Sequence, residues 1–193
     1  MLCLSGCGAL SEFRLGKLAE RLEPRLPGIE GIEAFYLHLV DTTRELTTRE
    51  RERLEDLLDY GDDSAEESGV SEYGELSLLV APRPGTVSPW SSKATDILHN
   101  CGLGAVRRVE RAVAWRLTTP GRVLLPAEVR PVADLLHDRM TEALLEREEE
   151  AAVLFEQSAP APLTRVALGE DGRGALEAAD RELGLALAPD EID

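Results

Sequence analysis

The chain has 193 residues and a mass of 21.1 kDa, enough for one domain or for one domain and part of another. Its 37 acidic residues outnumber its 21 basic ones, and the net charge of −16 argues against a free-standing nucleic-acid-binding protein. No run of about 18 apolar residues predicts a membrane span, and the N-terminus lacks the pattern of a secretory signal. Three cysteines do not form a disulfide framework, which suits a reducing compartment. Together with the lack of a membrane span and of a secretory signal, this leads us to expect a cytoplasmic protein with no membrane partner.

The first 62 residues predict a strand–helix–strand–helix unit. A strand over Met1–Ser5 precedes a helix that Ser11 caps, and a long strand follows over Ile29–Val40. Thr47 and Glu50 have the spacing of a capping box and predict the start of a second helix, with Gly61 as its stop. Alternation divides the long strand into two faces, one with Phe35, Leu37 and Leu39 and the other with Ala34, Tyr36 and His38. Neither face is plainly polar, so we expect both to be covered.

A segment rich in acidic residues, Gly61–Tyr73, predicts a linker between this first half (1–62) and a second half (73–147). The second half repeats the element order. It comprises a strand over Glu75–Ala81, a polar loop over Pro82–Ser92, a helix over Lys93–Cys101, a strand over Val106–Leu117, and a helix from Pro126 whose apolar positions include Val132, Leu135, Leu136, Met140 and Leu144. This order predicts an α+β fold with two pseudo-equivalent halves, an antiparallel sheet, and helices on one face.

The character of the sequence changes after residue 147. Residues 148–170 carry a charge run and the sequence Ser158-Ala-Pro-Ala-Pro162, and we interpret them as a linker. A helix is predicted over Asp171–Leu185, and residues 171–193 are expected to begin a further domain that is truncated here.

Three groups of residues only weakly indicate a cofactor, metal or catalytic site. The glycines Gly6 and Gly8 resemble part of a dinucleotide-binding turn, but the last glycine of that pattern is absent, so a simple turn is expected. Cys3, Cys7, His99 and Cys101 lack the spacing of a zinc site. His38 and His137 are isolated histidines without a readable nucleophile. We therefore predict no catalytic, cofactor-binding or metal-binding residue in this chain.

The stronger signal is the loop that begins at Pro82. It combines prolines, hydroxyl residues, a tryptophan and one of the two lysines, which is more than a connection needs. A rigid polar loop beside a helix N-terminus suits either a phosphate or the surface of another domain. The candidate residues for this interdomain or substrate-side surface are Arg83, Thr86, Ser88, Trp90, Ser91, Ser92 and Lys93.

The same stretch resembles a known family. Pro82–Leu103, with the sequence PRPGTVSPWSSKATDILHNCGL, is similar to the N-terminal region of phosphoribosylformylglycinamidine synthases of the large single-chain type. Three other stretches agree in order with that family: Ala9–Arg14, Leu136–Met140 and Leu183–Asp193. The resemblance implies an N-terminal domain that looks like a duplicated form of the small separate synthase subunit, followed by the start of a helical linker domain.

The resemblance also implies a function. Enzymes of this family use ATP, Mg²⁺ and ammonia from glutamine to convert formylglycinamide ribonucleotide to formylglycinamidine ribonucleotide in purine synthesis. Their catalytic residues lie beyond the region that this chain matches, so we expect the chain alone to be inactive, with the synthase and glutaminase domains as its partners. Two alternatives remain: a free-standing assembly or regulatory subunit, and an unrelated small-molecule-binding domain.

Overall fold

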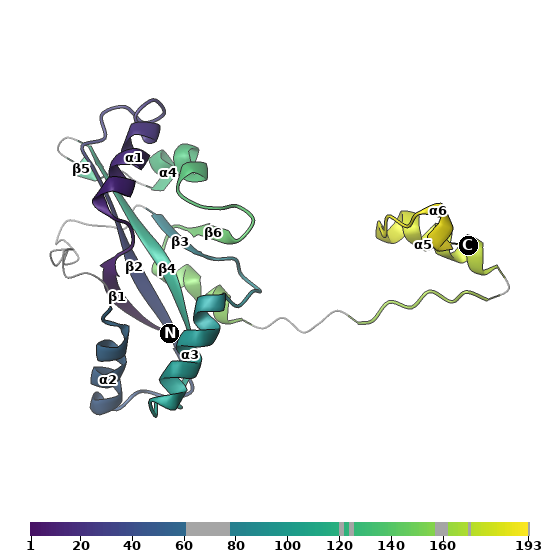
Figure 1. The fold of residues 1–193 in the computed structure, drawn as a ribbon, viewed down its shortest axis with the longest axis horizontal. Coiled ribbons are helices and arrows are strands. Elements are labelled where there is room, and N and C mark those ends of the chain that lie inside the picture. The colour runs from purple at the N-terminus through teal and green to yellow at the C-terminus, as the bar shows by residue number, and fades with distance from the viewer. Residues whose placement is uncertain (61–77, 120–121, 124–125, 157–161, 170, 193) are drawn as a thin grey trace. The chain divides into compact units, whose positions relative to one another are not determined.

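A computed structural model describes residues 1–60, 78–119, 122–123, 126–156, 162–169 and 171–192. The chain divides into two compact units, Met1–Gln157 and Ser158–Asp193. The first unit is a mixed sheet-and-helix domain, and the second carries two helices (Figure 1). The predicted linker over residues 61–73 and the helix stop at Gly61 lie outside the described residues.

One sheet organises the first unit. Its strand order is β1-β2-β4-β3-β6, each neighbouring pair is antiparallel, and β5 pairs with β4. The α+β fold expected from the sequence is thereby confirmed. The strands are β1 (Leu2–Gly8), β2 (Gly31–Thr42), β3 (Leu78–Pro82), β4 (Val106–Thr119), β5 (Arg122–Val123) and β6 (Glu142–Leu145).

The helices of the first unit begin largely where the sequence places their caps. Ser11 precedes α1, and Thr47 and Glu50 form the predicted capping box of α2, with hydrogen bonds in both directions. The helical elements are α1 (Glu12–Leu22), α2 (Thr48–Leu58), α3 (Pro89–Asn100), α4 (Pro126–Val129) and the 3₁₀ helices η1 (Arg130–Leu135) and η2 (Glu148–Phe155).

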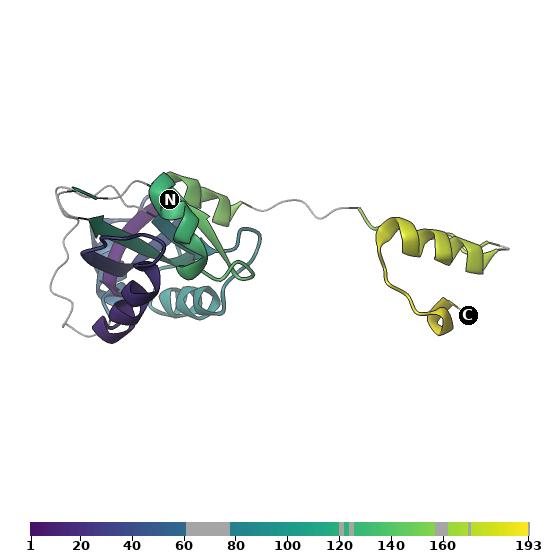
Figure 2. The same cartoon turned by 90° about the horizontal axis from the view of Figure 1, so that it is seen from above.

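Both faces of the sheet are covered, as the alternation in β2 predicts. Ala34 faces α1 and η1 in one core cluster, and Val40 faces α2 and α3 in another on the same side of the sheet. The opposite face packs Phe35, Leu37 and Leu39 against η2. Figure 1 shows α1 and α4 near one end of the sheet and α2 and α3 near the other, and Figure 2 gives the view of the same unit from above. The middle of that first face is therefore filled by side chains rather than by a helix.

The predicted helix does begin at Pro126, but its expected continuation to Leu144 is wrong. Only α4 and η1 are helical there, and the chain then turns and enters β6. Pro131 has no N–H to donate, which disfavours a continuous α-helix. Met140 is 75% exposed at the turn, and Leu144 pairs with Val80 of β3. The periodic spacing of these two residues with Val132 is accidental.

Two shorter segments also differ from expectation. Gly6 and Gly8 belong to β1, whose register with β2 shifts between Ser5 and Gly8, so they do not form a turn between strand and helix. The predicted loop over Pro82–Ser92 is shorter, because α3 already begins at Pro89. Proline suits the first position of a helix, since the N–H it lacks would have no partner there.

In the second unit, α5 (Gly172–Leu183) confirms the helix predicted from Asp171. Asp171 caps it by accepting a hydrogen bond from the Gly174 N–H, and Gly184 ends it with a left-handed φ of 64°. A short helix, α6 (Pro189–Ile192), follows. In the part of the chain that the structure describes, no helix is long and apolar enough to cross a membrane.

Candidate functional site

A buried carboxylate closes the N-terminus of α3. Ser88 is the N-cap, and its Oγ accepts a hydrogen bond from the Ser91 N–H at 3.0 Å. Glu110 of β4 is fully buried and accepts two hydrogen bonds from Ser88, from the backbone N–H at 3.2 Å and from the hydroxyl at 2.7 Å. The N-terminus of a helix attracts an anion, and here the domain supplies that anion from its own sheet.

Arg108 neutralises Glu110 and joins three parts of the domain. Its Nε donates to the Glu110 carboxylate at 3.1 Å, its Nη2 to the Thr86 carbonyl at 2.7 Å, and its Nη1 to the Leu154 carbonyl at 2.9 Å. The guanidinium also lies 5.4 Å from the ring centroid of Phe155. A single side chain thus fixes the turn before α3, the strand β4 and the end of η2 against one another.

This arrangement distinguishes the two interpretations of the Pro82 loop. A phosphate at the N-terminus of α3 would meet the Glu110 carboxylate, which already accepts the hydrogen bonds of Ser88 and repels a second anion. The turn is also held from within, because the Thr86 hydroxyl donates to the Arg83 carbonyl at 2.6 Å. The geometry therefore argues against a phosphate at this helix N-terminus.

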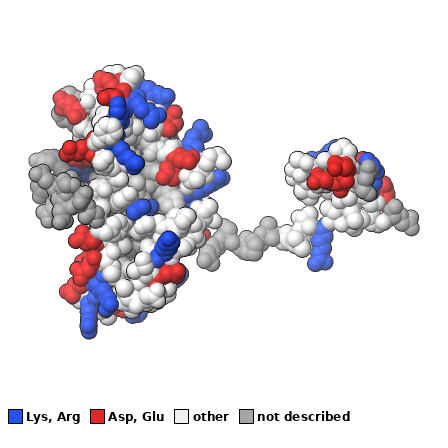
Figure 3. Space-filling model, viewed as in Figure 1, with Lys and Arg blue, Asp and Glu red and all other residues white. Residues whose placement is uncertain are grey.

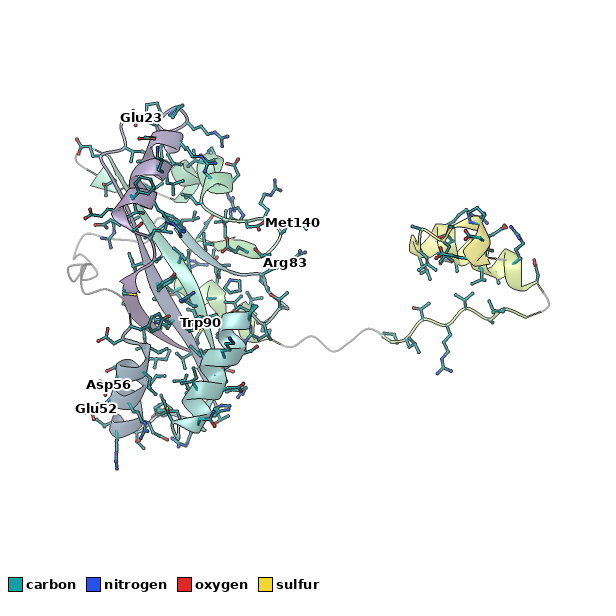
Figure 4. The ribbon with its side chains drawn as sticks, in the orientation of Figure 1. Glu23, Glu52, Asp56, Arg83, Trp90 and Met140 are labelled. Atoms are coloured by element: carbon teal, nitrogen blue, oxygen red, sulfur yellow. The ribbon has the colours of Figure 1, made fainter. Side chains whose placement is uncertain are left out.

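The seven candidate residues differ in whether their side chains face the interior of the domain or the solvent. Ser88 and Ser91 face inward: Ser88 binds Glu110, and Ser91 is fully buried. Trp90 is partly exposed and packs against the α2–α3 core. The exposed members are Arg83, Thr86, Ser92 and Lys93. Figure 4 shows Arg83 at the same edge of the unit as Met140, and the Arg83 N–H donates to the Thr141 carbonyl at 3.0 Å.

Trp90 belongs to a cluster that the sequence did not reveal as one site. The Arg111 guanidinium lies 4.0 Å from the ring centroid of Tyr36 and 4.9 Å from that of Trp90. Its Nη1 donates to the Tyr60 hydroxyl at 3.2 Å. We call Tyr36, Tyr60, Trp90 and Arg111, all partly exposed, the Arg111 cage. Its members come from β2, from the residue that follows the C-cap of α2, from α3 and from β4.

His38 forms the floor of the cage. It is fully buried, its Nε2 is 2.8 Å from the Tyr60 hydroxyl, and its ring stacks on Trp90 with centroids 5.7 Å apart. Burial, and then the charge of Arg111, lower the pKa of His38 to about 4, although the Leu4 backbone raises it. A Cβ at Gly6 would lie 2.7 Å from Cε1 of this ring, so the glycine lets β1 pass beside His38. A neutral, enclosed imidazole of this kind supports packing rather than acid–base catalysis.

The other histidines and the cysteines occupy structural positions. Nε2 of His99 lies 2.7 Å from the Val106 carbonyl, and Nδ1 of His137 lies 2.6 Å from the Ala133 carbonyl. Cys3 is in β1 and Cys101 is the C-cap of α3, as expected from the sequence. Within the described ranges, no three His, Cys, Asp or Glu side chains gather in an arrangement that holds a metal ion.

The charged residues leave the middle of the sheet face comparatively apolar. In Figure 3, red atoms gather at the lower left over α2, where Figure 4 labels Glu52 and Asp56. The surface between the upper and lower helices is mainly white with a few blue atoms. Figure 4 labels Trp90, a member of the Arg111 cage, between these two groups of helices.

A comparison with known protein families identifies the family of this chain. The family model described as the formylglycinamide ribonucleotide amidotransferase N-terminal region matches residues 35–155. The matched segment begins within β2 and ends at Phe155, the last residue of η2. It therefore contains Ser88, Glu110, Arg108 and the whole Arg111 cage. The same enzyme family was expected from the motif that begins at Pro82, and that expectation is confirmed.

Proposed function

This chain belongs to the family of formylglycinamide ribonucleotide amidotransferase N-terminal domains, and from that premise we propose that it holds the synthase and glutaminase parts of the enzyme together. The enzyme acts in purine biosynthesis. In our proposal, the complete enzyme uses ATP, Mg²⁺ and glutamine to convert formylglycinamide ribonucleotide to formylglycinamidine ribonucleotide, and it does so in the cytoplasm. The residues that perform the chemistry lie in its other domains, so this chain alone has no activity.

The observation that carries the proposal is the internal anchoring of the turn before α3. Glu110 and Arg108 use their hydrogen bonds to fix Ser88 and Thr86 from the inside. The outward side chains of the same segment, including Arg83, remain free to contact a partner. A surface that is rigid before binding loses less conformational entropy when it docks.

The apolar neighbours of Arg83 support a protein partner rather than a solvent-facing role. Val87, in the segment between β3 and α3, is 57% exposed, and Met140, in the turn before β6, is 75% exposed. Large exposed apolar side chains at the rim of a fixed polar turn are typical of interaction surfaces. Among the described residues, the Arg83 guanidinium has no ion-pair partner within the domain. It is therefore available to a carboxylate of another domain.

For ammonia transfer, we propose that this chain holds the glutaminase and synthase parts in place relative to each other. Ammonia released by a glutaminase must reach the synthase without escaping to water, so the two parts must be held at a fixed separation and orientation. The chain contributes rigid β4 and its anchored turn to that arrangement. No step of the chemistry is assigned to its side chains.

The proposal is tested in the complete enzyme with the variants Arg83→Ala and Trp90→Ala. The measurement is the ratio of glutamate released to formylglycinamidine ribonucleotide formed. We expect this ratio to rise above the wild-type value in both variants, because a loosened interface lets ammonia escape. Arg51→Ala is the control, since Arg51 makes only an exposed ion pair with Glu55 on α2. Unchanged coupling in both test variants would refute the proposal.

A further inference from the structure

Arg111 differs from the other arginines of β4 in having no carboxylate partner among the residues that the structure describes. Arg107 pairs with Asp41 at 2.8 Å, Arg108 with Glu110, and Arg116 with Glu33 at 2.9 Å. Within the described part of the chain, no Asp or Glu side chain forms an ion pair with Arg111. The chain carries a net charge of −16, so acidic residues are abundant. Among the described residues, Arg111 is thus a positive charge that no acidic side chain of the domain neutralises.

The surroundings hold the Arg111 guanidinium in place without neutralising it. The rings of Tyr36 and Trp90 lie 4.0 Å and 4.9 Å from its central carbon, and the Tyr60 hydroxyl accepts one hydrogen bond. A guanidinium has five N–H donors, and contacts with aromatic rings leave its charge uncompensated. Buried His38 is neutral near pH 7, because its pKa is lowered to about 4. Among the contacts of the described residues, the Arg111 guanidinium therefore keeps its positive charge and has N–H donors without an acceptor.

The composition of the cage is that of a protein–protein contact. Tryptophan, tyrosine and arginine are the residues most enriched among those that dominate binding energy at interfaces. All four members of the cage are partly exposed, so a partner can reach them. A single fixed guanidinium matches a single carboxylate in charge, and the two groups bind each other through paired hydrogen bonds. A phosphate dianion would leave a negative charge uncompensated in these aromatic surroundings.

We propose that the Arg111 cage is the docking point for an acidic side chain, Asp or Glu, on the synthase–glutaminase part of the amidotransferase. This inference rests on the proposed function and names the chemistry of one contact in that interface. Arg111 supplies the charge, and the rings of Tyr36 and Trp90 fix the orientation of its guanidinium. His38 stacks on Trp90, and Gly6 leaves room for the His38 ring beside β1. The contact is separate from Arg83, which lies at the edge near Met140 (Figure 4).

The first experiment measures binding between the 193-residue chain and the synthase–glutaminase part, produced as one polypeptide, by calorimetry at two salt concentrations. We expect Arg111→Gln to weaken binding at least about tenfold, because a desolvated charge pair loses one partner. Arg111→Lys should give an intermediate loss, since it keeps the charge but not the paired donors. Arg107→Gln is the matched control on the same strand and should bind like the wild type.

The outcomes separate this inference from the proposed function. If the wild-type chain does not bind, both fail. If Arg83→Ala weakens binding and Arg111→Gln does not, the docking role of the cage is refuted and the proposed function stands. Quenching of Trp90 fluorescence by inorganic phosphate that disappears in Arg111→Gln, with partner binding unchanged, would also overturn the inference and indicate a small-anion site.

A second measurement in the complete enzyme does not depend on separating its parts. Arg111→Gln is expected to raise the ratio of glutamate released to product formed, whereas Arg107→Gln leaves it at the wild-type value. Far-ultraviolet circular dichroism and melting temperatures of both variants establish that they are folded. A folded Arg111→Gln enzyme with wild-type coupling would contradict the proposal.

Discussion

The carboxylate of Glu110 accepts hydrogen bonds from both the backbone N–H and the hydroxyl of Ser88, and so joins the central strand to the cap of α3. A helix cap usually depends on side chains within the same segment. Here the cap is itself held by a residue 22 positions away. The position of the helix relative to the sheet is therefore specified by one buried charge.

Replacing Glu110 with alanine should destabilise the domain by about 3 kcal/mol, because Arg108 loses its carboxylate while remaining largely enclosed. Chemical denaturation with urea measures the free energy of unfolding. Glu55→Ala, which removes an exposed ion pair on α2, is the control and should change it by less than about 1 kcal/mol. Equal effects of the two substitutions would show that the Glu110 network does not stabilise the fold.

His38 should make stability depend on pH. Its pKa is lowered to about 4 in the folded domain by burial and by Arg111, and an unfolded histidine has a pKa of about 6.5. The unfolded state therefore binds the proton more readily, and stability from this group is fully present above pH 6.5 and declines as the pH falls toward 4. The full loss corresponds to about 3 kcal/mol.

Urea denaturation of the wild type and of His38→Gln between pH 4 and 7 measures this dependence. The substitution removes the titrating group, so the difference in unfolding free energy between the two proteins should narrow as the pH falls. A parallel pH dependence of the two proteins would contradict the prediction. In the wild type, the His38 ring signals in nuclear magnetic resonance spectra should not titrate between pH 5.5 and 8.

Two glycines should respond to alanine in opposite directions. Gly6→Ala places a Cβ against the His38 ring, so we expect a loss of about 1–3 kcal/mol through overpacking. Gly16 lies within α1, where an added methyl group would meet no neighbouring side chain within 4 Å. Gly16→Ala should therefore stabilise the domain by about 1 kcal/mol, since alanine favours the helix. Melting temperatures that shift in the same direction for both variants would refute this account of Gly6.

Cys3 should be a slow nucleophile. Burial, and then the charge of Glu148, raise the pKa of its thiol to about 11, so little thiolate is present at pH 8. Site-resolved mass spectrometry after brief iodoacetamide treatment should show Cys3 reacting at least about tenfold more slowly than a peptide thiol. Glu148→Gln should speed the reaction because it removes a neighbouring negative charge. An unchanged rate would leave burial as the sole cause.

The strands and caps could be predicted because their signals are local. Alternation over Phe35–Leu39 predicted which residues share a face, and the spacing of Thr47 and Glu50 predicted the start of α2. The predicted extension of the Pro126 helix to Leu144 was wrong because apolar residues of the 3₁₀ helix η1 and of β6 happen to share a helical spacing. Periodicity alone cannot distinguish such a coincidence from a continuous helix.

The candidate site was only partly accessible from the sequence. Trp90 was identified because a large aromatic residue is unusual in a connecting turn. Arg111, Tyr36 and Tyr60 were missed because each is unremarkable in its own segment and the cage exists only when β2 and β4 pair. A signal was present in the strand pairing: Arg111 and His38 lie directly opposite each other in the register of β2 and β4.

The order of the strands has a consequence for synthesis on the ribosome. β2 pairs with β4, and the ion pair between Glu33 and Arg116 across them spans 83 positions of sequence. When β1 and β2 leave the ribosome, one edge of β2 can pair with β1, but its other edge has no partner until β4 has been translated. A nascent chain in that interval exposes an apolar strand edge that other chains can join. We therefore expect slow codons or a chaperone to matter most before β4 has left the exit tunnel.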